Sequence, residues 1–550
     1  MEDNFTFEGK VILVTGGATG IGAGLVRSIL SQNARHVTFL DLAEHKSEVL
    51  ERELKNKFGT LRVMFIKCDV SDEKQLNEAY NKVINKFHRL DIVINNAAIL
   101  SEEENLYKRM VDVNFSAVIS STLRALATMA VDKGGSGGVI LNVSSMMALT
   151  PSNSLAVYSA TKAAVLQFTN SIAINKSYSK SEVRVLSVCL GPTDTAILHK
   201  HNSELFDKGC TQCFTSRVPE RQRVESAVKG IIDVIKKAEN GSTWIIASNK
   251  PPVDITVSVR EGLQNRCNDV GGSLSLARMT YDLKDKVILI TGAATGIGSR
   301  VVRIAVAEEA KHVAILDIAV EAGIAFQNEL NSEYGNNKVQ FIKGDVSNAE
   351  ELNAAFAKVK DEFGYIDVVI NNAGILNDNL QVYVKQIDIN VTALVTSSLK
   401  ALELMRKDER GKGGVVINVS SVAAICGVPD TPIYSATKAA VLKFTTAMGS
   451  DLYYTRTGVR FLTVCFGATN TPLLSAEKMG SFDPKVEAGI VATLKKLKWQ
   501  SPESAARGVV DTYKKGSSGS VWLISGDKPA VEVTDLYNKG IALFDHLIYN

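Results

Sequence analysis

The stretch TGGATGIG at positions 15–22 returns as TGAATGIG at positions 291–298, 276 residues further along the chain. The run YSATKAAVL is identical at 158–166 and at 434–442. A repeat of this length indicates a fused duplication of a whole domain, because solenoid repeats are only about 20–50 residues long. The same offset relates further pairs of positions: Asp41 and Asp317, Asp69 and Asp345, Asn95 and Asn371, Asn114 and Asn390, Ser145 and Ser421, Lys162 and Lys438.

At 550 residues the chain is too long for one hydrophobic core, and the repeat gives each half a domain of ordinary size. We expect a first domain at 1–264 and a second at 283–550. The stretch between them, 265–282, contains Gly271, Gly272 and several small polar residues, which is typical of a linker.

The charge balance argues against nucleic-acid or acidic-membrane partners, because 62 basic residues face 59 acidic ones without a long basic run. The acidic start, MEDN, does not resemble a signal peptide, and no apolar stretch is long enough to cross a bilayer. Seven scattered cysteines indicate free thiols, and the pair Cys210 and Cys213 lacks a second pair to complete a metal site. We therefore expect a cytoplasmic protein without a structural metal.

Each half alternates short Val/Ile/Leu runs with longer helical patterns, which is typical of βαβ units around a parallel sheet. Seven strands per half predict two α/β domains of the doubly wound Rossmann type, each with a mainly parallel sheet flanked by helices. The expected strands are 10–15, 36–40, 62–69, 91–95, 139–143, 183–189 and 243–247 in the first half, and 286–291, 312–316, 339–345, 367–371, 415–419, 460–465 and 520–524 in the second.

The glycine-rich stretch lies between a strand and a helix in both halves, a context that predicts a dinucleotide site. Its glycines would permit a tight turn, let the backbone approach a pyrophosphate and allow close packing, while the helix N-terminus offers amide donors. The plainer alternative is a structural glycine turn. The glycines concerned are Gly16, Gly20 and Gly22, with Gly292, Gly296 and Gly298.

Asp41 and Asp317 fall at the end of the second strand, where a carboxylate accepts hydrogen bonds from the adenosine ribose and repels a phosphate. Leu42 and Ile318 follow them, and no Arg or Lys stands beside either acid or within the glycine turn. The pattern therefore favours NAD over NADP as cofactor. The alternative for each Asp is a helix N-cap.

Five motifs occur in order in each half: TGxxxGxG, Asp-Val after the third strand, Asn-Asn-Ala after the fourth, a Ser ending the fifth, and YxxxK on the next helix. Together they resemble the short-chain dehydrogenase/reductase family over nearly the whole chain. Within it, GGVILNVSS with VYSATK looks most like the NAD-dependent hydroxyprostaglandin dehydrogenases and insect alcohol dehydrogenases. The resemblance implies further cofactor contacts from Thr19, Ile21, Asp69, Val70, Asn95, Ala97, Thr193 and Thr195, and from Thr295, Ile297, Asp345, Val346, Asn371, Ala373, Thr469 and Thr471.

Tyr158 and Lys162 are four residues apart, hence on one helix face, so the ammonium can lie near the phenol. A phenol with a pKa of about 10 must drop roughly three units to act as a base near neutral pH. Lys162 and the positively charged oxidised nicotinamide are the groups that could stabilise the phenolate. Tyr158 would then take the alcohol proton while Ser145 holds the substrate oxygen.

By resemblance, Asn114 shapes the preceding helix and holds a water that relays the proton from Lys162. In the second half the same roles fall to Asn390, Ser421, Tyr434 and Lys438. Each has a plainer alternative: a packed aromatic, a solvated lysine, a strand-end cap or a turn residue.

One position departs from the family pattern. The second half keeps Asn-Asn-Ala-Gly at 371–374, whereas the first has Ala98 in place of the glycine. A methyl there could crowd the backbone beside the cofactor, or strain it if the position needs a positive φ. This position therefore distinguishes the first predicted site from the second.

The stretches after Thr195 and Thr471 differ most between the halves, which suggests different substrate pockets. Apolar residues follow both serines, 146–149 in the first half and 422–425 in the second. Lining of the site by these residues would indicate a lipophilic secondary alcohol or ketone, although core packing explains them equally well. One catalytic half beside a structural half, or a non-catalytic NAD sensor, are the alternatives to two active sites.

The helices that carry the two tyrosines are apolar almost all round, since 155–175 holds only one charged residue and 433–450 only two. Such a helix is buried on more than one side. With the long helices expected at 103–130 and 379–406, they predict a pseudo-twofold dimer of the two halves within one chain, and further homodimerisation stays open.

Overall fold

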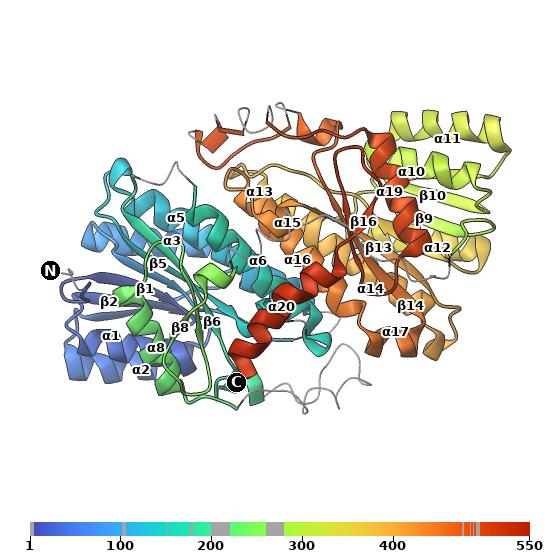
Figure 1. Ribbon diagram of the computed structural model, residues 1–550. Coiled ribbons are helices and arrows are strands. Elements are labelled where there is room, and N and C mark those ends of the chain that lie inside the picture. Colours follow the sequence, from blue (N-terminus) through green and yellow to red (C-terminus); the bar gives the residue numbers. More distant parts are fainter. Residues whose placement is uncertain are drawn as a thin grey trace. The chain divides into compact units, whose positions relative to one another are not determined.

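A computed structural model describes residues 5–101, 106–150, 152–175, 180–199, 220–259, 280–475, 478–484, 486–487, 489–490 and 496–549. The chain divides into two compact units, the first formed by Met1–Gly262 with Ile541–Asn550 and the second by Leu263–Gly540. Of the expected linker, only 280–282 lie within the described residues. The fold of each unit is shown in Figure 1.

The first unit contains one eight-stranded sheet in the order β3-β2-β1-β4-β5-β6-β7-β8, parallel except for the pair β7–β8. Its strands are β1 Val11–Thr15, β2 His36–Asp41, β3 Val63–Lys67, β4 Ile92–Asn95, β5 Gly138–Ser145, β6 Val183–Leu190, β7 Thr243–Ile246 and β8 Val253–Asp254. Its helices are α1 Gly20–Ser31, α2 Glu44–Phe58, α3 Glu73–Phe87, α4 Tyr107–Val111, α5 Ala117–Met129, α6 Ala156–Ala173, α7 Ala196–His199 and α8 Val224–Lys237.

The second unit repeats this sheet in the order β11-β10-β9-β12-β13-β14-β15-β16. Its strands are β9 Val287–Thr291, β10 His312–Asp317, β11 Val339–Lys343, β12 Val368–Asn371, β13 Gly414–Ser421, β14 Val459–Phe466, β15 Val521–Ile524 and β16 Val531–Glu532. Its helices are α10 Gly296–Ala307, α11 Val320–Tyr334, α12 Ala349–Phe363, α13 Tyr383–Ile387, α14 Leu394–Met405, α15 Ala423–Cys426, α16 Pro432–Met448, α17 Asp451–Thr457 and α19 Pro502–Lys515. The last helix, α20 Thr534–Tyr549, begins in the second unit, and its residues from Ile541 onward are counted with the first.

The predicted α/β fold is confirmed, but the predicted number of strands is wrong by one in each half. The eighth strand is a two-residue antiparallel edge, β8 or β16, which is too short to show a hydrophobic period. The long helix expected at 103–130 begins at Tyr107 within the described residues, and the one expected at 379–406 begins at Tyr383.

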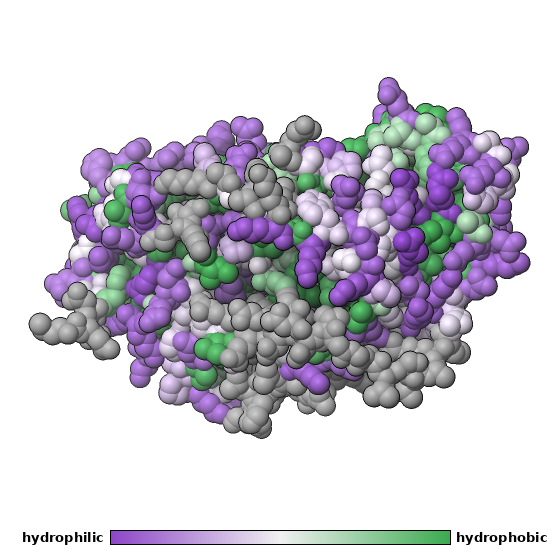
Figure 2. All heavy atoms as spheres, turned by 45° about the horizontal axis from the view of Figure 1, so that its top comes forward, coloured by the Kyte–Doolittle hydropathy of each residue, from purple (hydrophilic) through white to green (hydrophobic). Residues whose placement is uncertain are grey.

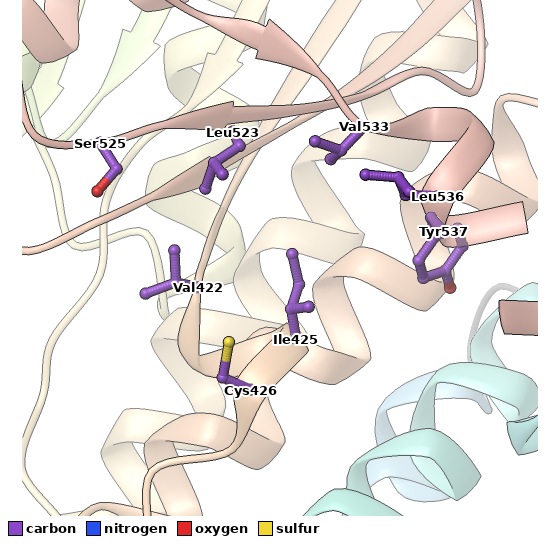
Figure 3. Close-up of a pocket in the computed structure, with 8 residues that line it drawn as sticks. All are labelled: Val422, Ile425, Cys426, Leu523, Ser525, Val533, Leu536 and Tyr537. Carbon is purple, nitrogen blue, oxygen red and sulfur yellow. The ribbon is translucent and has the colours of Figure 1, made fainter. Parts of the chain in front are cut away.

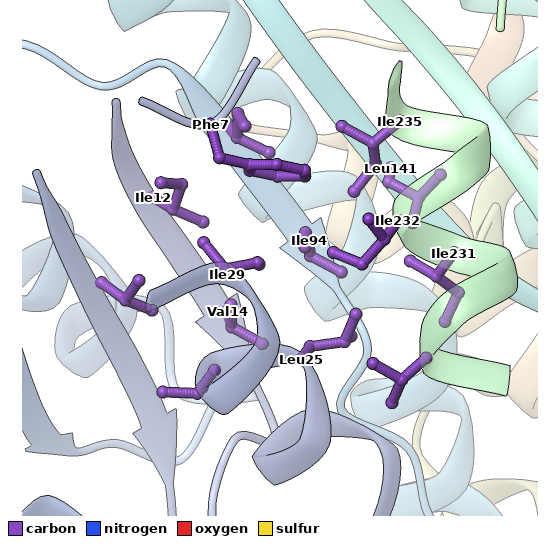
Figure 4. Packing of buried hydrophobic residues seen from close by; sticks show 14 of the residues in the cluster. Phe7, Ile12, Val14, Leu25, Ile29, Ile94, Leu141, Ile231, Ile232 and Ile235 are labelled. Carbon is purple, nitrogen blue, oxygen red and sulfur yellow. The ribbon is translucent and has the colours of Figure 1, made fainter. Parts of the chain in front are cut away.

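Apolar β-strand residues and the facing helices form the core of each unit. In the first unit Ile12 and Val14 of β1 and Ile94 of β4 pack beneath Leu25 of α1 and Ile231 of α8 (Figure 4). The equivalent cluster in the second unit lies between its sheet, α10 and α19. Helices therefore cover both faces, and the strand order reverses between β1 and β4, which is where such sheets bind ligands.

Hydrophilic residues are spread over the face drawn in Figure 2, with apolar residues in small groups between them. Within the described part of the chain, no helix combines the length and apolar character needed to span a membrane. The cysteines partly contradict the prediction of free thiols. Cys68, Cys189 and Cys465 are free and buried, whereas Cys426 is disulfide-bonded.

Candidate active site

The glycine turn of the first unit follows β1 and leads directly into α1. Gly16 and Gly20 have positive φ angles of 66° and 51°, which residues with a Cβ rarely adopt. A Cβ on Gly22 would lie 1.9 Å from the Gly16 carbonyl oxygen, so this glycine is required for close packing. Thr19 is the N-cap of α1 but makes no side-chain cap, which leaves the first amides of the helix available to an anion.

The second unit reproduces this turn. Gly292 and Gly296 have φ angles of 64° and 63°, and Thr295 caps α10 without a side-chain hydrogen bond. A Cβ on Gly298 would lie 2.7 Å from the Gly292 carbonyl oxygen. The side chains of Ile21 and Ile297 pack against the hydrophobic cores of their units. Their backbones form the first turns of α1 and α10, next to the glycines.

A threonine and an asparagine that the sequence analysis missed hold the turn to the neighbouring strand. The Thr15 hydroxyl accepts hydrogen bonds from the backbone N–H groups of Asn96 and Ala97, both at 3.0 Å. The Asn96 amide donates to the Gly16 carbonyl at 3.1 Å. Thr291, Asn372 and Ala373 repeat the arrangement. Both missed residues lie inside the quoted motifs, TGGATGIG and Asn-Asn-Ala, so their position in these motifs could have identified them.

The side chains of Asn95 and Asn371, two predicted cofactor contacts, are engaged in buried polar networks. Asn95 donates to Asn142 at 2.8 Å and accepts from Ser121, inside a buried polar network. Asn371 makes the same bonds with Asn418 and Ser397. Any contact with a dinucleotide would have to use their backbones, because a buried polar side chain keeps its partners.

The carboxylate of Asp41 lies beside the glycine turn. One oxygen accepts from the backbone N–H of Ala18 and the other from Ala43, both at 2.9 Å. Ala43, not Asp41, is the N-cap of α2, so the capping alternative does not describe this residue. Asp317 makes the equivalent bonds in the second unit.

The predicted acids after the third strand are ion-paired. Asp69 accepts from Arg109 at 2.7 Å and from Ser71, and these contacts lower the pKa of its carboxyl group despite partial burial. Asp345 pairs with Lys385 at 3.0 Å. The following residues, Val70 and Val346, are half-buried in the turn after their strand.

Thr193 and Thr195, two predicted cofactor contacts, follow β6, and Thr195 lies against the glycine turn. A Cβ on Gly20 would lie 3.1 Å from the methyl of Thr195, so these two segments touch. Thr193 is held by Gln222, a buried residue that the sequence analysis missed, at 3.1 Å. In the second unit Thr469, Thr471 and Gln500 take these positions.

The four predicted catalytic residues lie together in each unit. Ser145 ends β5 and is hydrogen-bonded to the hydroxyl of Tyr158 on α6. The Lys162 ammonium lies 5.8 Å from the centre of the Tyr158 ring and donates to the Val143 carbonyl at 3.0 Å. In the second unit Ser421, Tyr434 and Lys438 match this arrangement, with the ammonium 5.6 Å from the ring centre.

Asn114 lies where the long helix is interrupted by a π-helical turn, Asp112–Ser116. Its side chain accepts from the Ile99 N–H and donates to the Ile99 carbonyl, both at 2.8 Å. Asn390 does the same with Ile375, in the π-helical turn Asp388–Ala393. Such turns are rare and are often found at functional sites.

The electrostatics of the side chains alone do not produce a phenolate. Burial raises the pKa of Tyr158 and of Tyr434 to about 12, although the serine hydrogen bond acts in the other direction. Burial also lowers the pKa of Lys162 and Lys438 to about 8. The serine hydrogen bond alone therefore does not offset the effect of burial on either tyrosine pKa.

One of the two expected effects of Ala98, strain at a positive φ, does not occur, because Ala98 does not have a positive φ. Its counterpart Gly374 does not have a positive φ, so no strain arises from the residue type. A Cβ on Gly374 would instead lie 3.2 Å from the Asn390 side-chain oxygen and 3.4 Å from the Lys438 ammonium. The equivalent methyl of Ala98 is therefore expected to face Asn114 and Lys162, two predicted catalytic residues, rather than backbone atoms.

Apolar side chains surround the phenol of the second unit. Tyr434 packs in a buried cluster with Ala423, Leu376, Met479 and Ile490. Of the four apolar residues after Ser421, which could line the site or pack in the core, Ala423 packs against Tyr434 in this core cluster. Partly buried side chains extend the cluster: Val428, Leu473 and Leu474. Most of the corresponding stretch of the first half, 200–219, lies outside the described residues.

Val422 and Ile425 line a different pocket, of about 160 Å³, on α15 and the strand β15 (Figure 3). Its other walls are Cys426, Leu523, Ser525, Val533, Leu536 and Tyr537. Since neither Ser421 nor Tyr434 contributes to its lining, this pocket is separate from the phenol. Across the described part of the chain, no cluster of His, Cys, Asp or Glu is arranged to hold a metal ion.

Comparison with known proteins gives consistent results for both halves. The family model described as short chain dehydrogenase matches residues 10–205 and 286–480. The 15-hydroxyprostaglandin dehydrogenase [NAD(+)] of Macaca fascicularis is 37% identical over 196 residues, which cover 36% of this chain and 73% of that protein. Alcohol dehydrogenase 1 of Ceratitis capitata is 34% identical over 190 residues, covering 34% and 71%.

Among solved structures, the C-domain of a bacterial malonyl-CoA reductase with NADP aligns with a TM-score of 0.62 at 14% identity. The alignment covers 92% of this chain and 96% of that one, and at this identity it supports the fold alone. The family model accounts for most of the chain in two successive segments. The chain therefore belongs to the short-chain dehydrogenase family and carries its domain twice.

Proposed function

We propose that each unit transfers hydride between NAD and a lipophilic secondary alcohol or ketone. The observation that carries the proposal is the placement of Tyr434, hydrogen-bonded to Ser421, beside the Lys438 ammonium and inside an apolar cluster. The similarity to 15-hydroxyprostaglandin dehydrogenase [NAD(+)], whose name gives NAD as its cofactor and a hydroxyprostaglandin as its substrate, supports both the cofactor and the substrate class.

In this proposal the glycine turns and the uncapped N-termini of α1 and α10 hold the pyrophosphate. Asp41 and Asp317 receive the adenosine ribose. The nicotinamide accepts or donates the hydride when bound. Ser421 orients the substrate oxygen, Tyr434 exchanges the proton at that oxygen, and Lys438 supplies positive charge beside the phenol.

The test is NADH fluorescence appearing when the purified chain meets NAD and a panel of secondary alcohols of increasing apolar size. We expect turnover to rise with apolar size, because the walls around the phenol are apolar. Binding of NAD without any turnover would favour the alternative of a sensor or scaffold. Better turnover with sugars or hydroxy acids would contradict the substrate class.

We further propose that the two units associate within the chain as a pseudo-twofold dimer and that the protein acts in the cytoplasm. The supporting observation for the association is that the helices α6 and α16 are apolar almost all round, since 155–175 holds one charged residue and 433–450 only two. Substitution of the fully buried Ala164 or Ala440 by Asp should separate or unfold the units, as X-ray scattering would show. Scattering from the unaltered protein that fits two independently moving units would contradict the association.

A further inference from the structure

A buried carboxylate holds the start of the catalytic helix in the second unit. Asp378, in the loop after β12, is fully buried and accepts from the backbone N–H groups of Ile433 at 2.8 Å and Tyr434 at 3.0 Å. Gln386 of α13 donates to it at 2.8 Å. The first amides of a helix lack intrahelical partners, so Asp378 satisfies two of them at the catalytic residue itself.

The same loop holds the segment that covers the phenol. The backbone N–H of Asp378 donates to the Gly480 carbonyl, and the Asn377 amide donates to the Lys478 carbonyl, both at 2.9 Å. A Cβ on Gly480 would lie 2.6 Å from the Asn377 side-chain oxygen, so the glycine permits this approach. Met479, between the two held carbonyls, packs in the cluster around Tyr434.

We propose that Asp378 is a positioning residue that couples the apolar wall at Met479 to the backbone of Tyr434. This inference rests on the proposed function of the second unit and adds to it. The wall and the proton-exchanging phenol are held by one side chain and its own backbone, so a substrate that contacts Met479 meets Tyr434 in a fixed position. Gln386 supports the loop by accepting from the Asn377 N–H at 2.6 Å.

The first half does not carry the same residues. At the paired positions its sequence has Glu102 for Asp378 and Met110 for Gln386. Met110 is buried on α4, and a thioether cannot replace both hydrogen bonds of the glutamine. We therefore restrict the proposal to the second unit, and the first unit serves as the comparison in both tests.

The first test measures turnover of one site at a time with a lipophilic alcohol. In a Tyr158→Phe background, Asp378→Ala should lower kcat and raise KM, reducing kcat/KM by about tenfold or more, because two buried amides lose their acceptor. Asp378→Asn, which keeps an acceptor oxygen, should restore part of the loss. In a Tyr434→Phe background Asp378→Ala should leave first-site turnover unchanged. An unchanged kcat/KM in the first background would overturn the proposal.

The second test does not depend on activity. Hydrogen exchange of the full chain without NAD should become faster in Asp378→Asn both at 478–481 and at 433–436, with 157–160 of the first unit unchanged. Faster exchange at only one of the two segments would overturn the coupling. If Asp378→Ala does not fold, the exchange of the Asp378→Asn variant still tests the proposal. Failure of the proposed function has a different signature, namely absent turnover in both backgrounds with the exchange pattern retained.

Discussion

The carboxylate of Asp41 accepts a hydrogen bond from the backbone N–H of Ala18 at 2.9 Å, so the residue expected to select the cofactor also holds the glycine turn. Asp317 and Ala294 are related in the same way at 3.0 Å. The two roles are compatible, because an ionised carboxylate has about four acceptor positions.

Cofactor choice can therefore be altered at this point. Replacing Asp41 and Asp317 by Ser, with Leu42→Arg and Ile318→Arg, should weaken NAD and improve NADP use. The arginines are accommodated because Leu42 and Ile318 are exposed. Kinetics with both cofactors give the measurement, and we expect some loss of stability from the freed Ala18 amide, about 1–3 kcal/mol. Equal or better turnover of the unaltered protein with NADP would contradict the role of the acids.

The two phenols predict two independent sites. Tyr158→Phe and Tyr434→Phe should each leave residual turnover, while the double variant should have none above background, because each phenol alone is placed to exchange the substrate proton of its unit. NADH binding measured in parallel serves as the folding control. Complete loss in one single variant, with folding and NADH binding intact, would show that only one unit is catalytic.

The alanine at position 98 of the first unit and the glycine at position 374 of the second can each be replaced by the other residue type. Gly374→Ala should reduce second-site turnover several-fold, because its methyl would lie 3.2 Å from the Asn390 oxygen and 3.4 Å from the Lys438 ammonium. Ala98→Gly should raise first-site turnover by a similar factor. Each is measured with the other phenol removed. Opposite signs, or no change in either, would show that this methyl does not affect the catalytic pair.

The buried lysine of the second unit predicts a pH-dependent stability difference. Burial lowers the pKa of Lys438 from 10.5 to about 8, so between these values the unfolded chain binds more protons than the folded chain. The cost of burying the ammonium is therefore fully present below pH 8 and fades as the pH rises to 10.5. Lys438→Met should lose second-site turnover and yet be more stable at pH 7, by at most about 3 kcal/mol.

The advantage of Lys438→Met is reduced by the lost hydrogen bond to Val419, about 1 kcal/mol, and should shrink further by pH 10. Urea unfolding of both proteins at pH 7 and pH 10 gives the comparison. Lys400→Met, at a partly exposed helix position, is the control and should show no such trend. A difference in the free energy of unfolding that is the same at pH 7 and pH 10 would contradict the lowered pKa of Lys438.

The sequence alone determined the duplication, the alternation of strands and helices and the candidate residues of two catalytic sets. These features are encoded locally, because burial on both faces of a parallel sheet and the spacing of Tyr158 and Lys162 are visible in neighbouring residues. Strand boundaries were predicted to within about two residues for the long strands. The edge strands β8 and β16 were missed, since two residues carry no period.

Only the tertiary structure decided where polar side chains point. Asn95 is the last residue of β4 at the site edge, yet its side chain turns into the core because Asn142 and Ser121 lie there. Asp378 carries no motif, and its importance arises from contacts with Tyr434, 56 residues later, and with Gly480. The direction and partners of a side chain depend on which distant segments pack around it, and no local pattern contains that information.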